Sequence, residues 1–209
     1  MSKLIERPLR DVLESFAAPR PTPGGGAAAA LAGAVGASLF VMVAGMPRTR
    51  TGSEADRQAL DQVLRELRPS RDHLADLVDR DTEAYDAVVA AHRLPKGTPD
   101  EQAARTAAVQ AALRGATEVP LDVMRACQAV VHEGTTVARH GNPAAASDVG
   151  VALELLVAAL RGAAANVRAN LDSVRDVGFA SGARDEAERL ERAMELSIAE
   201  ARQALAAPA

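Results

Sequence analysis

Apolar residues recur along most of the chain at intervals of three and four, the spacing that places side chains on one face of an α-helix. Alanine and other helix-forming residues dominate, and alternating runs of β-branched residues, typical of strands, are absent from the sequence. Amphipathic helices are predicted over residues 3–16, 53–91, 98–139, 143–174 and 184–205. The apolar side of the first one consists of Leu4, Leu9, Val12, Leu13 and Phe16. The pattern predicts an all-α fold, a single-domain helical bundle over residues 1–209.

Several of these helices carry boundary signals. Ser53 is a good N-cap, a capping box begins at Thr98, and Asn142 precedes a proline at the start of a further helix. Pro69 and Pro120 fall inside predicted helices. Because proline lacks the N–H that a helix interior needs, we expect each to kink or break its helix.

The helix that differs from the others follows Pro21-Thr22-Pro23-Gly24-Gly25-Gly26. No residue between Arg20 and Arg48 carries a charge, and small residues fill the segment from about 27 to 45. This segment is a transmembrane helix, a plain buried helix, or a buried helix whose glycine loop lines a site. Since its neighbours are amphipathic, we favour the last interpretation. No Gly-Lys-Ser/Thr follows the glycines, so the loop is a poor match to a P-loop.

Composition narrows the function further. The net charge is −4 and four residues are aromatic, which argues against a nucleic-acid partner bound by bulk charge or base stacking. Cys127 is the single cysteine, so no intramolecular disulfide forms and a reducing compartment fits. The N-terminus has no apolar segment of signal-peptide length. We therefore expect a cytoplasmic protein with no membrane partner.

Two helices carry candidate polar sites. Asp81 and Tyr85 are four residues apart and share a helix face, so both could reach one ligand, although acidic runs on helices are usually solvated. In the helix over residues 143–174, Asp148 and Asn166 point the same way, and Asn170 lies close to that direction. This stripe on an apolar helix needs hydrogen-bonding partners. About 27 Å separate Asp148 from Asn166 along a straight helix, so one subunit cannot bring both to one small ligand.

The sequence lacks the residue patterns that several kinds of catalysis require. The four histidines show no metal-ligand spacing with carboxylates, so no metal is expected. No Gly-x-Ser-x-Gly elbow occurs, and Cys127 has no histidine near it in sequence. Carboxylates, amides, a glycine loop and scattered cations remain. That set suits binding of a polar heterocycle and general acid–base catalysis on it.

Motifs along nearly the whole chain resemble one family, the C-terminal domain of formiminotransferase-cyclodeaminase, which also includes stand-alone methenyltetrahydrofolate cyclohydrolases. The similar segments are Pro21 to Gly26 with the Ala/Gly helix, Leu94-Pro95-Lys96, Ala116-Thr117, Val119-Pro120-Leu121, Gly141-Asn142, Ser147-Asp148-Val149, Asn166-Val167-Arg168-Ala169-Asn170, and Asp176. The resemblance implies a dimer-forming helical bundle. It also implies a tetrahydrofolate derivative as substrate, with no tightly bound cofactor. The reaction would be hydrolysis of the methenyl group or cyclodeamination of a formimino group, each needing a proton moved by a carboxylate.

The resemblance also suggests roles. The acid–base group would be Asp148, with Asp81 as the alternative. The folate would be bound by Pro23, Gly24, Gly25, Gly26, Tyr85, Ser147, Asn166 and Asn170. Its glutamate tail would meet Arg48, Arg50, Lys96 or Arg168. Family members often carry a lysine-rich stretch where this chain has Arg48-Thr49-Arg50-Thr51-Gly52. Two other classes remain possible: a non-catalytic folate-binding homo-oligomer and a structural bundle with no ligand.

Overall fold

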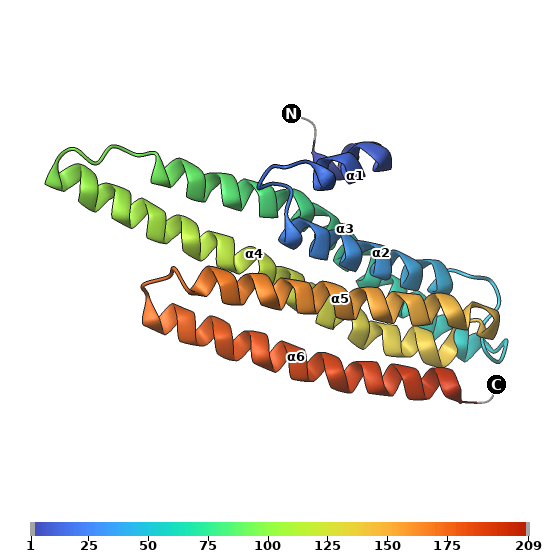
Figure 1. The fold of residues 1–209 in the computed structure, drawn as a ribbon. Coiled ribbons are helices and arrows are strands. Elements are labelled where there is room, and N and C mark those ends of the chain that lie inside the picture. The colour runs from blue at the N-terminus through green and yellow to red at the C-terminus, as the bar shows by residue number, and fades with distance from the viewer. Residues whose placement is uncertain (1–2, 208–209) are drawn as a thin grey trace.

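Six α-helices and two short 3₁₀ helices follow one another along residues 3–207, the part of the chain that the computed structural model describes (Figure 1). The elements are η1 (Leu4–Glu6), α1 (Leu9–Ala17), α2 (Gly25–Ala44), α3 (Glu54–His92), α4 (Pro99–His140), η2 (Pro143–Ala145), α5 (Ala146–Leu171) and α6 (Val177–Ala206). Residues 3–207 contain no strand. The all-α prediction is confirmed, and one cluster of buried side chains joins the helices.

The two prolines do not break their helices. Pro69 lies inside α3, which runs for 39 residues, and Pro120 lies inside α4, which runs for 42. Of the two predicted outcomes, a kink or a break, the break does not occur at either proline. Each of these helices packs along the other, and Pro120 itself is buried. Tertiary packing of this extent outweighs the roughly 3 kcal/mol that an interior proline costs.

The predicted helix starts are present as capping contacts. The Ser53 hydroxyl accepts a hydrogen bond from Asp56 N at 3.2 Å, and the Thr98 capping box is complete. Asn142 Oδ1 accepts from Ala144 N at 3.0 Å. The last helix begins earlier than predicted, at Val177, because Asp176 acts as its N-cap.

Helix α2 lies inside the bundle, against α3, α4 and α5. Its small residues permit close contact: a Cβ added at Gly36 would lie 2.9 Å from Leu156 Cγ. By length and composition alone, α2 and the segment Pro143–Leu171 could cross a membrane, but 56% of the α2 window is buried in the bundle. The expected buried Ala/Gly helix is therefore the central helix of this fold.

Helix α1 lies on the outside of the bundle (Figure 1). The amides of Leu4 and Ile5 donate to the carboxylate of Asp79 on α3 and attach this segment. Leu9 is 68% exposed and Leu13 is 59% exposed, so part of the apolar side predicted for the first helix is not covered by the bundle. A helix of nine residues covers too little surface to bury a whole apolar stripe.

A Gly134→Ala variant should be destabilised by about 1–3 kcal/mol, because a Cβ at this position of α4 would lie 2.3 Å from the buried ring of Phe40. The ring is rigid and enclosed, so the helices must separate. Gly150→Ala is the matched control, since nothing lies within 4 Å of its Cβ position on α5. Thermal or urea unfolding measures both. Equal stability of the two variants would contradict this packing.

The α3–α4 hairpin projects beyond the turn between α5 and α6 (Figure 1). The start of α2 and the last turns of α5 meet this hairpin partway along its length. Backbone ends and side chains from four helices therefore come together at one place, where the fold leaves a pocket.

Candidate functional site

A polar pocket of about 260 Å³ lies where α2 begins. Four segments line it: the glycine loop, the C-terminal third of α3, the middle of α4 and the last turns of α5. The lining residues are Pro21, Thr22, Gly24, Gly25, Gly26, Asp81, Ala84, Tyr85, Val88, Leu113, Ala116, Asn166 and Asn170. A carboxylate, a phenol and two amides therefore share one cavity with the start of a helix.

Asp81 is the one acidic residue in this lining, and it faces the start of α2. Its Oδ2 accepts a hydrogen bond from Ala27 N at 2.9 Å. Gly26 permits the contact, since a Cβ there would lie 2.0 Å from Asp81 Oδ1. Burial raises the pKa of Asp81 above its ordinary value of 3.8, and the bond from Ala27 opposes that rise. The carboxyl group can therefore take up and release a proton nearer to neutral pH than an exposed aspartate can.

Both asparagines line the pocket, and each donates one hydrogen bond from its amide nitrogen to a backbone oxygen. Asn166 Nδ2 donates to Gly162 O at 2.8 Å, and Asn170 Nδ2 donates to Ala116 O at 2.7 Å. One N–H of each amide is thereby used, and within residues 3–207 each Oδ1 accepts no hydrogen bond and can accept one from a ligand. A ring edge that carries N–H groups fits these acceptors. Tyr85, 41% exposed, stands at the same wall as Asp81, one helical turn away.

The structure brings together six of the predicted substrate-binding residues, and Asp81 with them. Gly24, Gly25, Gly26, Tyr85, Asn166 and Asn170 all line the pocket. Pro23 does not, and lines a neighbouring hollow instead. Ser147 and Asp148 lie in the first turn of α5, at the opposite end from Asn166. Within one subunit, Asp148 and Asp81 therefore do not share this pocket.

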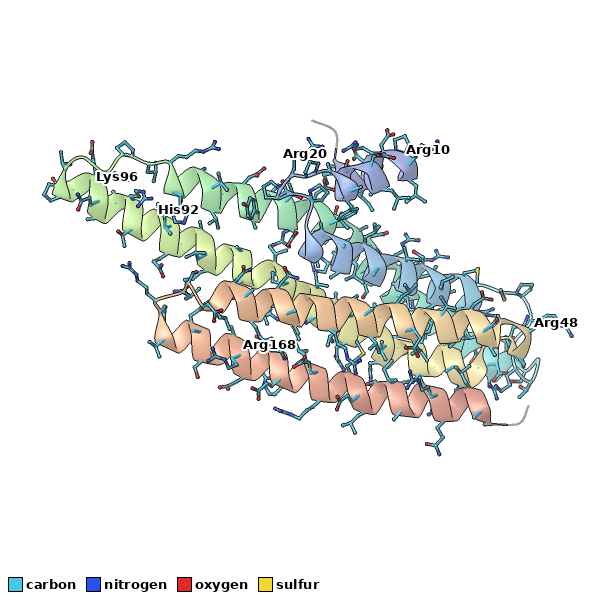
Figure 2. All side chains as sticks on the ribbon, in the orientation of Figure 1. Arg10, Arg20, Arg48, His92, Lys96 and Arg168 are labelled. Atoms are coloured by element: carbon cyan, nitrogen blue, oxygen red, sulfur yellow. The ribbon has the colours of Figure 1, made fainter. Side chains whose placement is uncertain are left out.

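The predicted arginines after α2 are distant from the pocket. Helix α2 is 20 residues long, so about 30 Å separate the glycine loop from Arg48 and Arg50 (Figure 2). Arg50 holds this end of the bundle together, donating to Ala138 O at 3.0 Å and Ala207 O at 2.9 Å. Beside it, Asp56 accepts from His140 Nδ1 at 2.7 Å, a contact that lowers the pKa of Asp56. The loop between α2 and α3 thus has a structural role, because Arg50 ties it to the end of α4 and to the end of the chain.

The other two predicted cations are also directed elsewhere (Figure 2). Lys96 is exposed in the turn that joins α3 to α4, beyond the end of α3 at His92. About 16 Å of helix separate Asp81 from that end. Arg168 lies on α5 between the two asparagines, but its guanidinium contacts Glu191 on α6 at 2.6 Å. Neither cation lines the pocket.

The sequence analysis does not predict some of the residues that line the pocket. Val88 and Leu113 belong to the apolar spacing of α3 and α4, which reads as core, and Ala84 and Ala116 carry no chemical signal. Thr22 belongs to the loop that marked the site, and its place between two prolines was the available signal.

Other candidate centres carry less chemistry. Burial raises the pKa of the Cys127 thiol to about 12, so it stays protonated near neutral pH and is a poor nucleophile. Within residues 3–207, no three histidine, cysteine or acidic side chains gather as a metal site. A larger hollow of about 600 Å³ separates α5 from α6, but charged side chains such as Arg202 and Glu154 pair with each other there. The smaller pocket contains the partly buried carboxyl group of Asp81.

An all-α bundle with a carboxyl group held against a glycine loop defines a small-molecule-binding, acid–base type of domain. The chain belongs to the formiminotransferase-cyclodeaminase family, whose model matches residues 8–189. It is 42% identical over 168 residues to a methenyltetrahydrofolate cyclohydrolase of Methylorubrum extorquens, covering 80% of this chain and 81% of that protein. The resemblance seen in the motifs is confirmed.

Longer relatives and a solved structure agree. The chain is 35% identical over 211 residues to the formimidoyltransferase-cyclodeaminase of Sus scrofa, which covers 96% of this chain but only 38% of that protein. The crystal structure of a formiminotetrahydrofolate cyclodeaminase from Thermotoga maritima superposes with a TM-score of 0.85. It is 30% identical and covers 96% of this chain and 97% of that one.

Proposed function

We propose that this chain is a folate one-carbon enzyme that hydrolyses 5,10-methenyltetrahydrofolate to 10-formyltetrahydrofolate. The observation that carries the proposal is the carboxyl group of Asp81, which hydrogen-bonds Ala27 N inside the pocket. The 42% identical relative of similar length, named as a methenyltetrahydrofolate cyclohydrolase, supports this choice of reaction.

In the proposed reaction, water adds to the methenyl carbon that joins N5 and N10. The Asp81 carboxylate accepts one proton from the attacking water. The bond from the carbon to N5 then breaks, N5 takes the proton from Asp81, and the second water proton leaves to solvent as the formyl C=O forms. Atoms and charge balance, because the methenyl cation and water give neutral 10-formyltetrahydrofolate and one proton.

The rest of the pocket fits the substrate. The pterin ring carries N–H donors, and Asn166 and Asn170 each have an unused amide oxygen. A Cβ added at Gly25 would lie 3.6 Å from Asn166 Nδ2, so the glycine loop and this amide lie next to each other in the pocket. Val88 and Leu113 supply apolar wall, as ligand pockets usually have.

The alternative reaction is cyclodeamination of formiminotetrahydrofolate. The Thermotoga neighbour, which covers nearly the whole chain and carries that activity in its name, favours this second candidate. Here N10 attacks the carbon of the protonated formimino group, whose nitrogen carries two hydrogens, and Asp81 accepts the N10 proton. Asp81 then passes that proton to the same nitrogen, the bond from carbon to that nitrogen breaks, and ammonia leaves the methenyl cation behind. The pocket residues would keep the same roles.

The test is to mix the purified chain with 5,10-methenyltetrahydrofolate and follow the loss of its near-UV absorbance against the uncatalysed rate. A large acceleration supports the hydrolase. If the rate stays at the uncatalysed level, formiminotetrahydrofolate and ammonia release are measured next. Folate binding with no turnover of either compound would overturn both reactions and favour a non-catalytic folate-binding protein.

The proposed assembly is a homodimer through the open face of α2. Val35 and Met42 on α2 are 45% and 43% exposed, and Val151 on the adjacent α5 is 53% exposed. An uncharged face of this kind is typical of an interface. A second copy could also bring its Ser147 and Asp148 near the pocket, which a single subunit does not do.

A Val35→Glu variant should therefore elute as a monomer, while the unaltered chain has about twice the mass of one subunit by light scattering. Burying an unpaired charge in an apolar interface is costly. Leu196→Glu is the control, because Leu196 is 75% exposed on α6, a different helix from α2. A dimer that survives Val35→Glu would rule out this face.

A further inference from the structure

The pocket lining contains no lysine or arginine. A folate carries carboxylates on its glutamate tail, so under the proposed function the tail must leave the pocket to find a cation. The four cations that the sequence suggested for it lie at the ends of the bundle or contact another helix. Within one subunit, the cation that binds the tail must therefore lie at the edge of the pocket.

A second hollow of about 710 Å³ adjoins the pocket, and Thr22 lines both. It lies between the N-terminal segment and α3. Its cations are Lys3, Arg7 and Arg20, and its acids are Asp79, Glu83 and Asp86. Opposite charges are thus equal in number, so the hollow does not attract free anions by bulk charge.

The three cations differ in their present contacts. Lys3 lies 3.5 Å from Asp76, and Arg7 donates to Asp11 O at 3.4 Å. Within residues 3–207, the Arg20 side chain makes no hydrogen bond or ion pair. Arg20 also directly precedes Pro21, which lines the reaction pocket. Arg20 is therefore the cation of this hollow that is exposed, lies next to the pocket-lining loop, and is free to bind a ligand.

The acids of the hollow are not equivalent either. Asp79 accepts hydrogen bonds from the amides of Leu4 and Ile5, so its charge is already partly compensated. Glu83 and Asp86 are exposed to water. They repel a free anion as much as the cations attract it, but a carboxylate tethered to a ring in the pocket is held at high effective concentration beside Arg20.

We propose that Arg20 binds the glutamate carboxylate of the folate tail where it leaves the pocket past Thr22. The inference rests on the proposed function and makes Arg20 a specificity residue for folates over the same ring system without glutamate. A guanidinium at an exposed edge gives a modest, charge-assisted contact. Arg20→Gln should therefore raise KM about 3- to 10-fold and leave kcat within about two-fold.

The experiment compares 5,10-methenyltetrahydrofolate with 5,10-methenyltetrahydropteroate, which keeps the reacting ring and lacks the glutamate. We expect Arg20→Gln to raise KM for the first compound only, and Arg20→Lys to restore part of the loss. Arg10→Gln is the charge-matched control, because Arg10 is exposed on α1 outside the hollow (Figure 2).

Equal effects of Arg20→Gln on both compounds, or no effect on either, would overturn the assignment while leaving the proposed reaction intact. If Arg10→Gln raised KM as much as Arg20→Gln does, the effect would come from the net charge of the protein, and the assignment of Arg20 to the tail would be wrong. If the unaltered chain neither binds nor turns over the methenyl compounds, the proposed function and this inference fail together.

Discussion

An Asp81→Asn variant is expected to lose a factor of about 10² to 10⁴ in kcat/KM for the folate substrate, the range that a positioned acid–base group contributes. Asparagine keeps an oxygen that can still accept the hydrogen bond from Ala27 N, now 2.9 Å from the carboxylate. The shape of the pocket is preserved and the proton carrier is removed. Steady-state kinetics of the two proteins measure the effect.

The pH dependence gives a second signature of the same group. If the Asp81 carboxylate accepts a proton from water, kcat/KM of the unaltered chain falls as the pH decreases through its pKa. Burial raises that pKa, so the decline begins at a higher pH than for an exposed aspartate. The Asp81→Asn variant should not show this decline in kcat/KM at low pH. The same decline in both proteins would mean that a group other than Asp81 ionises in this range.

Stability should respond in the opposite sense to activity. Because the pKa of Asp81 is raised in the folded chain, the native state binds more protons than the unfolded one between the two pKa values, and stability falls as the pH rises through that window. Above it, the ionised carboxylate destabilises the fold. The Asp81→Asn variant should therefore have the same Tm as the unaltered chain or a higher one near pH 8. This difference in Tm should shrink as the pH falls below about 4.

Asp148→Asn is the variant to compare with Asp81→Asn, because the family resemblance suggests Asp148 for the same acid–base role. Its place in the first turn of α5 leaves it outside the pocket of its own subunit. We expect this variant to stay within a few-fold of the unaltered chain in kcat/KM. A large loss at Asp148 with little at Asp81 would transfer the acid–base role to the far end of α5, supplied by a second subunit.

Much of the fold follows from local signals. The caps at Ser53, Thr98 and Asn142 depend on neighbouring residues, and all three are present as predicted. Local chemistry at Pro69 predicts a kink or a break, whereas the packing that keeps α3 continuous involves residues far along the chain. The exposure of Leu9 has a related reason: periodicity shows which side of a helix is apolar and not whether a neighbour covers it.

The site also has a part that the sequence predicts and a part that it does not. The spacing of four residues predicts that Asp81 and Tyr85 share a helix face. The sequence does not predict the contact of Asp81 with the start of α2, because the hydrogen bond to Ala27 spans 54 residues of sequence. This contact locates the pocket at the start of α2. Within one subunit, the length of that helix then puts Arg48 at the other end of the bundle, which the spacing of residues in the sequence does not reveal.

Gly26→Ala should abolish most activity through Asp81 while leaving the fold intact. A Cβ at this position would lie 2.0 Å from Oδ1 and 2.6 Å from Cγ of the Asp81 carboxyl, so the carboxyl must move away from Ala27 N. The group that moves is the end of a side chain, so the free energy of unfolding should change by only about 1 kcal/mol. Misplacement by about 1 Å can cost a factor of 10² in kcat/KM.

A double-mutant cycle separates this mechanism from general damage. If Gly26→Ala acts by displacing the carboxyl group, adding it to Asp81→Asn should cost much less than it costs alone, because the proton carrier is already absent. Gly115→Ala is the matched control on α4, next to Ala116 of the pocket wall, with nothing within 4 Å of its Cβ position. It should keep full activity. Additive losses for Gly26 and Asp81 would mean that the glycine serves the substrate directly, as the surface on which the ring lies.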